Sequence, residues 1–234
     1  MSLLHGKKGV VMGVANDHSI AWGISKKLSD EGAELCFTYQ GESLHRRVKP
    51  LANSINSNFL IECDVLKEGS VKKSFDEIGN HWGEIDFVLH SIAFSEKEEL
   101  KGKYLNTSRN NFSNTMLISC FSFTEVAHEA EKLMKNGGSL LTLTYDGSQK
   151  YIRNYNVMGV AKAALESSVR YLAADLGPSN IRVNALSAGP MKTLAMAGIS
   201  GGKDMMKWSE KNSLMNRNID LEAVSYTHLT LPTM

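Results

Sequence analysis

Cysteine is scarce in this sequence, with three residues, Cys36, Cys63 and Cys120, spread over 234 positions. None of them forms a CxxC pair or a cysteine–histidine cluster with metal-ligand spacing, which excludes the usual disulfide frameworks and zinc motifs. We therefore expect buried thiols in a reducing compartment, and no metal.

Charge of one sign is also missing, because 26 lysines and arginines nearly balance 25 aspartates and glutamates for a net charge of +1. Nucleic acids and acidic membrane surfaces attract strongly basic proteins, so we expect neither as a partner. No run is long and apolar enough to span a bilayer, and the first residues lack the apolar segment of a signal peptide. The sequence predicts a cytoplasmic protein whose partner is a small molecule.

Short β-rich runs alternate with helix-period segments along the chain, which is typical of βαβ units around a parallel sheet. The predicted fold is α/β: a Rossmann-like, doubly wound parallel sheet with helices on both faces. Helices are expected over residues 20–28 and 158–176. Strands are expected over residues 9–12, 34–39, 59–63, 86–91, 139–144 and 182–186.

A turn that suits a pyrophosphate follows the first strand. Gly13 allows a tight turn, and a helix beginning near Ile20 offers unpaired N–H groups to an anion. The GxGxxG pattern is absent, and Ser19 has an alternative interpretation as the cap of this helix. The turn alone is a weak indication of dinucleotide binding.

Polar residues at the ends of later strands strengthen this interpretation. Gln40 follows the second strand, where the adenosine ribose is met, and Asp64 and Val65 follow the third, where a carboxylate can meet the adenine amino group. The fourth strand ends at Ser91-Ile92-Ala93, whose backbone would pass the ribose. Each feature alone is also ordinary strand-end polarity, but together they lie where open α/β sheets bind ligands.

Gln40 also indicates which dinucleotide binds, because an amide can hydrogen-bond ribose hydroxyls. Gly41 and Glu42 follow it, where a 2′-phosphate would require a basic residue, and Arg46 and Arg47 come a turn later. We expect NADH rather than NADPH.

Tyr145 comes directly after the fifth strand, and Tyr155 and Lys162 stand near the start of the next helix. At ~100° and ~1.5 Å per residue, the latter two share one helix face, roughly 10 Å apart along the axis. A neutral phenol can donate a hydrogen bond to a carbonyl oxygen that gains charge as a hydride arrives, and an ammonium can hold ribose hydroxyls. Such a pair is ordinarily a solvated helix face, but after a strand of a dinucleotide-type sheet it predicts reduction next to a carbonyl.

The motifs resemble those of bacterial enoyl-acyl-carrier-protein reductases of the FabI type, within the short-chain dehydrogenase/reductase superfamily, from Leu4 to about Ala223. In the wider superfamily the lysine follows the tyrosine by four residues, whereas position 159 here is glycine and the spacing to Lys162 is that of enoyl reductases. The segments that carry the resemblance are Ser19-Ile20-Ala21-Trp22-Gly23, Phe37-Thr38-Tyr39-Gln40, Cys63-Asp64-Val65, His90-Ser91-Ile92-Ala93, residues 141–145, residues 154–162 and residues 182–190.

The resemblance implies NADH-dependent reduction of the trans-2 double bond of enoyl thioesters on acyl carrier protein, in type II fatty acid biosynthesis, by a homotetramer. It implies that Tyr155 hydrogen-bonds the thioester carbonyl, that Lys162 holds the nicotinamide ribose and that Tyr145 lies in the substrate pocket. The other residues implied are Met158, Ala195 and Ile199 at the substrate, and Met191 and Thr193 at the nicotinamide.

Two rival functions fit part of the pattern. A carbonyl reductase of the same superfamily, acting on 3-oxoacyl thioesters, is disfavoured by the lysine spacing and by Tyr145. A non-catalytic dinucleotide-binding protein would keep Gly13, Ser19 and Asp64 but would not need Tyr155 and Lys162.

The end of the sequence departs from the resemblance, which implies a further helix and a seventh strand after Ala223. Residues 224–234 match the translation of a transposon-derived sequencing adapter. We therefore expect residues 1–223 to form a single dinucleotide-binding catalytic domain lacking the final strand, and 224–234 to be a non-native tail. The alternative is an ordinary short tail. A chain without the last strand is expected to be poorly soluble or inactive.

Overall fold

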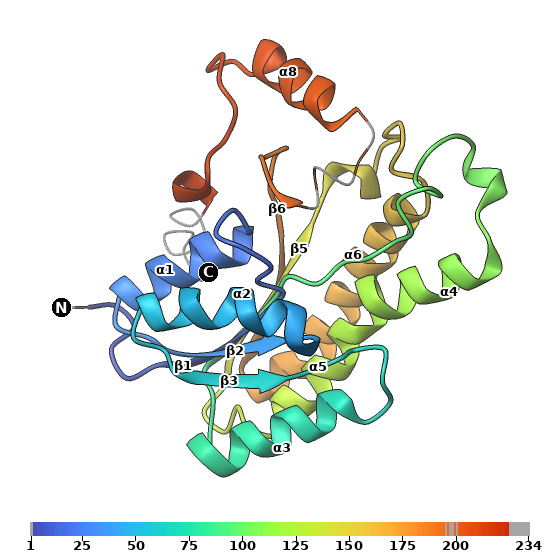
Figure 1. Cartoon of the computed structure of the whole chain (residues 1–234). Coiled ribbons are helices and arrows are strands. Elements are labelled where there is room, and N and C mark those ends of the chain that lie inside the picture. The colour runs from blue at the N-terminus through green and yellow to red at the C-terminus, as the bar shows by residue number, and fades with distance from the viewer. Residues whose placement is uncertain (1, 195, 197–198, 200, 225–234) are drawn as a thin grey trace.

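The computed structural model describes residues 2–194, 196, 199 and 201–224 (Figure 1). They form a six-stranded parallel sheet in the order β3-β2-β1-β4-β5-β6, so the strand order reverses between β1 and β4. This order is that of the doubly wound dinucleotide-binding fold, which confirms the predicted fold class. The strands are β1 (Lys8–Met12), β2 (Glu34–Tyr39), β3 (Phe59–Glu62), β4 (Phe87–His90), β5 (Gly138–Thr144) and β6 (Ile181–Ser187), each within one residue of the prediction at either end.

Helices cover both faces of the sheet. Figure 1 shows α1 and α2 together on one side and α3, α5 and α6 on the other, while α8 lies beyond the carboxyl ends of β5 and β6. The helix after β5 begins two residues earlier than predicted. The helices are α1 (Ile20–Asp30), α2 (Gly41–Ser54), α3 (Ser70–Trp82), α4 (Arg109–Met116), α5 (Ser122–Glu131), α6 (Asn156–Leu176) and α8 (Gly202–Asn212), with a π-helical turn over Leu117–Phe121 and short 3₁₀ turns over Tyr104–Asn106, Asp146–Ser148 and Gly177–Ser179.

Two hydrophobic cores follow from the alternation of side chains along each strand. Val11 and Phe37 face α1 and α2 and pack with Trp22, whereas Val10 faces the other side and packs with Phe75 of α3. The strands are therefore apolar on both faces, as a sheet covered on both sides requires. All three cysteines are buried and unpaired, as predicted.

β6 pairs only with β5 among the described residues, so it forms one edge of the sheet. Of residues 224–234, the structure describes only Val224, which is buried against Ala188 and Met191. That residues 1–223 form one catalytic domain and that 224–234 is a non-native tail stay predictions. None of the helices in the described ranges has the length and apolar character needed to cross a membrane.

Candidate active site

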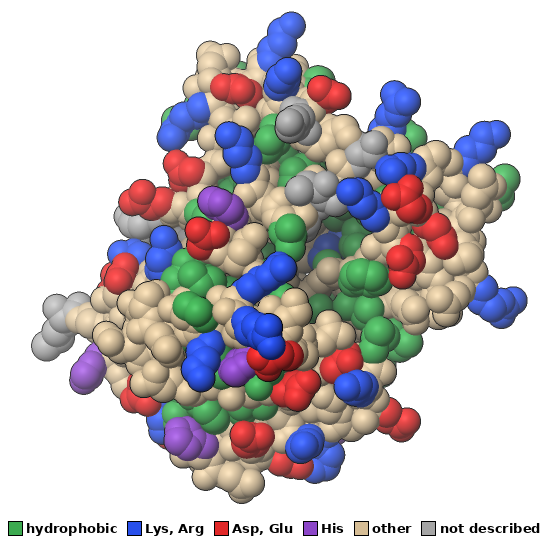
Figure 2. All heavy atoms as spheres, in the orientation of Figure 1, with side chains coloured by type: hydrophobic (Ala, Val, Ile, Leu, Met, Phe, Trp, Pro, Cys, Tyr) green, Lys and Arg blue, Asp and Glu red, His purple; other side chains and the backbone are tan. Residues whose placement is uncertain are grey.

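Two adjoining hollows lie at the carboxyl ends of the strands, where the strand order reverses. The first has a volume of ≈ 300 Å³ and the second of ≈ 440 Å³, and both are lined by Gly13, Ala15 and residues 91–94, so they form one groove. Figure 2 shows a hollow near the middle of this face with hydrophobic side chains on its rim. Both the volumes and the location suit a dinucleotide and a small substrate.

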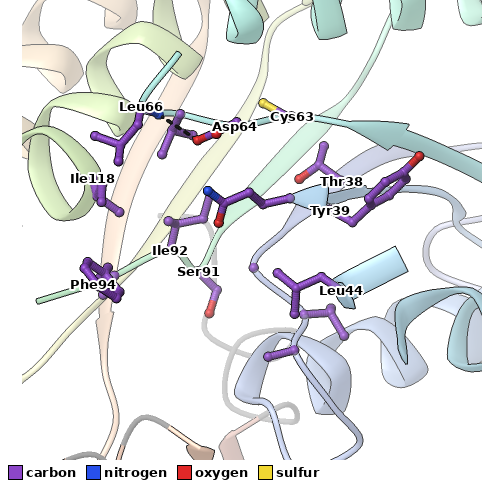
Figure 3. Close-up of a pocket in the computed structure, with 16 residues that line it drawn as sticks. Thr38, Tyr39, Leu44, Cys63, Asp64, Leu66, Ser91, Ile92, Phe94 and Ile118 are labelled. Carbon is purple, nitrogen blue, oxygen red and sulfur yellow. Dashed lines mark hydrogen bonds between the residues drawn. The ribbon is translucent and has the colours of Figure 1, made fainter. Parts of the chain in front are cut away.

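The first hollow is bounded by the ends of β2 and β3. Figure 3 shows Tyr39 and Leu44 on one side and Leu66, Ile118 and Phe94 on the other. The residues predicted to bind adenosine lie here: Gln40, Asp64, Val65, Ser91, Ile92 and Ala93 all line this hollow.

Asp64 is held in place at the end of β3. Its Oδ1 accepts a hydrogen bond from the Leu66 amide at 3.1 Å, and its Oδ2 lies 3.9 Å from the Lys67 ammonium. The carboxylate therefore lines the first hollow and can accept a hydrogen bond from a ligand.

Gly13 stands where β1 and β4 meet and has a φ of +95°. A Cβ at this position would lie 2.0 Å from the carbonyl oxygen of Ser91. Because the amide of Ser91 donates to Met12 O at 2.9 Å, the backbones of the two strand ends are in direct contact. Only glycine fits at this junction without displacing the floor of the groove.

Ser19 occupies the N-cap position of α1, but its hydroxyl does not cap the helix. It accepts hydrogen bonds from the amides of Ala15, at 3.0 Å, and Asn16, at 3.1 Å. The capping interpretation is therefore wrong: Ser19 folds the loop that precedes α1. Ser19 and Ile20 both line the second hollow.

Tyr145 and Tyr155 lie together in the second hollow. Their rings are edge to face with centroids 5.3 Å apart, and Tyr155, at the N-cap of α6, is only 7% exposed. Burial, with Tyr145 next to it, raises the pKa of Tyr155, and burial with the charge of Asp146 raises the pKa of Tyr145. Both phenols are therefore neutral at pH 7 and able to donate a hydrogen bond.

Lys162 enters the same hollow from α6. Its ammonium donates to the carbonyl of Leu143, near the end of β5, at 2.7 Å. Burial lowers the pKa of Lys162 to about 8, against the opposing influence of Cys120 and Glu166. The side chain is thus mostly charged at pH 7 and loses its charge just above it.

The family model described as enoyl-(acyl carrier protein) reductase matches residues 13–233. The chain belongs to this family. It is 60% identical over 229 residues to the enoyl-[acyl-carrier-protein] reductase [NADH] 2 of Rhizobium meliloti (strain 1021), covering 98% of this chain and 85% of that protein.

Solved structures of enoyl reductases agree with this membership. The crystal structure of FabI from Candidatus Liberibacter asiaticus has a TM-score of 0.96 and 54% identity, covering 99% of this chain and 90% of that one. The enoyl-(acyl-carrier-protein) reductase of Anaplasma phagocytophilum, crystallised in complex with NAD, has a TM-score of 0.94 and 52% identity, covering 98% and 87%. The resemblance to FabI-type enoyl reductases seen in the sequence is confirmed.

The structure explains why this enoyl reductase has glycine at position 159. A Cβ there would lie 2.8 Å from the carbonyl oxygen of Gly147, in the loop that carries Tyr145. Since any side chain at 159 would displace that loop, the superfamily's usual lysine position is closed, and the ammonium comes from Lys162 instead.

His90 supports the groove from beneath, at the end of β4. Ser122 donates its hydroxyl proton to Ile118 O at 2.7 Å, so its 2.9 Å contact with His90 requires the histidine Nε2 to donate. Nδ1 then accepts from the Thr142 hydroxyl at 3.1 Å. Complete burial and the nearby Lys162 charge lower the pKa of His90 to about 3, so it is neutral.

The remaining predicted residues, Met158, Met191, Thr193 and Ile199, line the second hollow, whereas Ala195 lies outside the described residues. Sequence reasoning missed other lining residues, of which Leu100 is an isolated apolar residue in a polar loop and could have been noticed. The residues of the second hollow that were not predicted are Ala15, Phe94, Ser95, Lys97, Leu100, Leu143, Thr144, Ala188, Gly189, Pro190, Leu194 and Met196. No cluster of three or more potential metal ligands occurs in the part of the chain that the structure describes.

Proposed function

We propose that this chain is an NADH-dependent enoyl-acyl-carrier-protein reductase that reduces the trans-2 double bond of enoyl thioesters. The observation that carries the proposal is that a neutral, buried Tyr155 and the Lys162 ammonium line the second hollow, which adjoins the first hollow with Gln40 and Asp64. Family membership supports the same reaction.

The groove fits a dinucleotide along its length. Asp64 offers an acceptor to adenine, Gln40 a hydrogen-bonding amide to the adjacent ribose, and Gly13 allows the pyrophosphate to approach the loop before α1. Lys162 would hold the nicotinamide ribose, next to Met191 and Thr193. When bound, NADH supplies the hydride that adds to C3 of the enoyl chain.

Tyr155 acts at the thioester carbonyl. The phenol donates a hydrogen bond to the oxygen on which negative charge develops, and its raised pKa keeps the proton on Tyr155 at neutral pH. Lys162 keeps the potential around that oxygen positive. C2 of the resulting enolate then takes a proton from Tyr155 or from a relayed water. Tyr145, Met158, Ala195 and Ile199 are proposed to contact the acyl thioester.

NADH is favoured over NADPH by the surroundings of Gln40. Arg46 pairs with Glu42 at 2.9 Å and does not line either hollow, so no basic side chain among the described lining residues beside Gln40 meets a 2′-phosphate. The Glu42 carboxylate follows Gln40 closely and would repel one.

We further propose a cytoplasmic homotetramer that takes its substrate from acyl carrier protein in type II fatty acid biosynthesis. Exposed apolar side chains on α4, the π-helical turn and α6 support an assembly surface: Phe112, Leu117, Phe121 and Tyr171. Sedimentation analysis tests the tetramer.

An NADH-oxidation assay with a crotonyl and a 3-oxoacyl thioester tests the proposed function. In a chimera that carries the C-terminal segment of the Rhizobium meliloti relative, we expect turnover with the enoyl substrate and a loss of kcat of ~10²-fold or more in Tyr155→Phe. Turnover of the 3-oxoacyl thioester alone indicates a carbonyl reductase, and NADH binding without turnover a non-catalytic protein.

The expectation that the chain is inactive as it stands stays a prediction. A chimera carrying the C-terminal segment of the Rhizobium meliloti relative tests it in the same assay. If the chimera is active and the unaltered chain is not, the expectation is supported. Equal activity of the chimera and the unaltered chain contradicts it.

A further inference from the structure

Glu166 holds both ends of the segment that carries Tyr145. It lies on α6, one turn after Lys162, and its Oε1 accepts hydrogen bonds from the hydroxyls of Thr144, at 2.6 Å, and Ser148. Its Oε2 accepts from the side-chain amide of Gln149 at 3.4 Å. One carboxylate therefore receives donors from both sides of Tyr145.

The carboxylate is suited to this role because it only accepts hydrogen bonds when ionised. Partial burial acts to raise the pKa of Glu166, but the hydrogen bonds from Ser148, Thr144 and Gln149 outweigh it, so the pKa is lowered. Charge-assisted hydrogen bonds of this kind are shorter and stronger than neutral ones. An ion pair within the loop, between Asp146 and Lys150, is solvent-exposed and holds the loop only weakly.

The segment held by Glu166 packs directly on the two tyrosines. A Cβ on Gly147 would lie 2.5 Å from the ring of Tyr155, so the loop backbone touches that ring. Tyr145 meets the same ring edge to face. A shift of the loop would therefore move Tyr145 relative to Tyr155.

We propose that Glu166 is a positioning residue that sets the place of Tyr145 in the second hollow by binding Thr144 and Ser148 at once. The inference rests on the proposed function. Glu166 does not line either hollow and does not contact the reacting atoms, so it acts through Tyr145.

A double-mutant cycle with Tyr145→Phe tests this role. Because a small displacement of a substrate-positioning group is costly, Glu166→Ala is expected to lower kcat for the enoyl thioester by ~10-fold. In the Tyr145→Phe background the same change is expected to cost less than ~2-fold, since coupled residues are non-additive. Glu166→Gln still accepts hydrogen bonds from both hydroxyls and is expected to keep most of the kcat of the unaltered protein. In both Glu166 variants the Kd for NADH is expected to stay within ~2-fold of that of the unaltered protein.

Two further variants keep the test decisive. Asp175→Ala removes an exposed carboxylate from the same helix and is expected to leave kcat unchanged. Ser148→Ala removes one of the hydrogen-bond donors to Glu166 and replaces Glu166→Ala in the cycle if that variant does not fold. The loss of kcat caused by Ser148→Ala should also disappear in the Tyr145→Phe background. Equal losses in both backgrounds, or a rise in the NADH Kd that matches the fall in kcat, overturn the proposal.

Failure of the proposed function is distinguishable from failure of this inference. If the unaltered chain is inactive, all kcat values are measured in the chimera with the C-terminal segment of the Rhizobium meliloti relative. Absence of enoyl turnover in that chimera speaks against the proposed function alone. Hydrogen exchange of the amides at 145–150 needs no turnover, and we expect it to rise in Glu166→Ala but not in Asp175→Ala. Unchanged exchange contradicts the positioning role.

Discussion

Replacing Gly13 with alanine probes the junction between β1 and β4 on which the groove depends. The new Cβ would lie 2.0 Å from the oxygen and 2.5 Å from the carbon of the Ser91 carbonyl. These are backbone atoms, so no change of rotamer relieves the contact. A non-glycine residue in left-handed backbone costs ~1–2 kcal/mol, and forcing extra volume into a packed site costs ~1–3 kcal/mol. The expected loss in the free energy of unfolding is thus ~2–5 kcal/mol.

Gly83→Ala is the matched control, because Gly83 has a φ of +74° and no atom within 4 Å of the added Cβ. It carries the backbone cost alone, ~1–2 kcal/mol. Urea unfolding followed by circular dichroism measures both losses. A fluorescence titration with NADH should show affinity weakened ~10-fold or more in Gly13→Ala, since the Ser91 backbone must move, and unchanged in Gly83→Ala.

Equal destabilisation by the two alanines, together with unchanged NADH affinity in Gly13→Ala, would refute this reasoning. It would mean that the end of β4 accommodates a methyl group without moving the floor of the groove.

Three other changes give measurable outcomes. With the pKa of Lys162 at about 8, kcat/KM should fall as the pH rises through that value, and Lys162→Met should flatten the pH–rate profile. The free energy of unfolding without ligand should rise from about pH 8 to ~10.4, because in this range the unfolded chain binds more protons than the folded chain. The double variant Gly159→Lys/Lys162→Ala moves the lysine to the usual position of the superfamily. Its new side chain should clash with the Gly147 carbonyl at a cost of ~1–3 kcal/mol and lower the thermal midpoint. Gly177→Ala, where the added Cβ has open space, should leave the thermal midpoint unchanged. Gln40→Arg should raise the ratio of kcat/KM with NADPH to kcat/KM with NADH by ~10-fold, which corresponds to the free energy of one charge-assisted hydrogen bond. An unchanged ratio would contradict the assignment of Gln40 to the adenosine ribose.

The strands were predictable because their residues are apolar on both faces and end at polar or glycine positions. Val10 and Val11 are both fully buried, on opposite faces of β1, so the run itself predicts a central strand. Gln40 and Asp64 could be placed for the same reason, since the carboxyl ends of parallel strands lie at one edge.

Contacts between distant segments were not predictable. Glu166 meets Thr144 and Ser148 across 22 and 18 positions, and this depends on how α6 settles on the sheet. The loop after β4 is held by Ser119, whose hydroxyl accepts from the amide of Phe94 at 3.0 Å. Ser119 stands in a π-helical turn, which no periodicity in the sequence indicates.

The sequence shows that residue 159 is glycine but not why a larger residue does not fit there. The cause is a carbonyl oxygen of Gly147, in a loop whose path is determined by its packing on α6. Backbone approaches of this kind become visible only in three dimensions.

The central position of β1 has a consequence for how the chain folds during synthesis. Met12 is paired in register with Thr38 on one side and with His90 on the other. The pairing of β1 with β2 joins residues 8 and 34, whereas the pairing of β1 with β4 joins residues 9 and 87, and such non-local pairing is slow. We expect a dinucleotide at this seam to bind only after β4 has docked, so that its binding free energy stabilises the folded chain and opposes separation of the two strands.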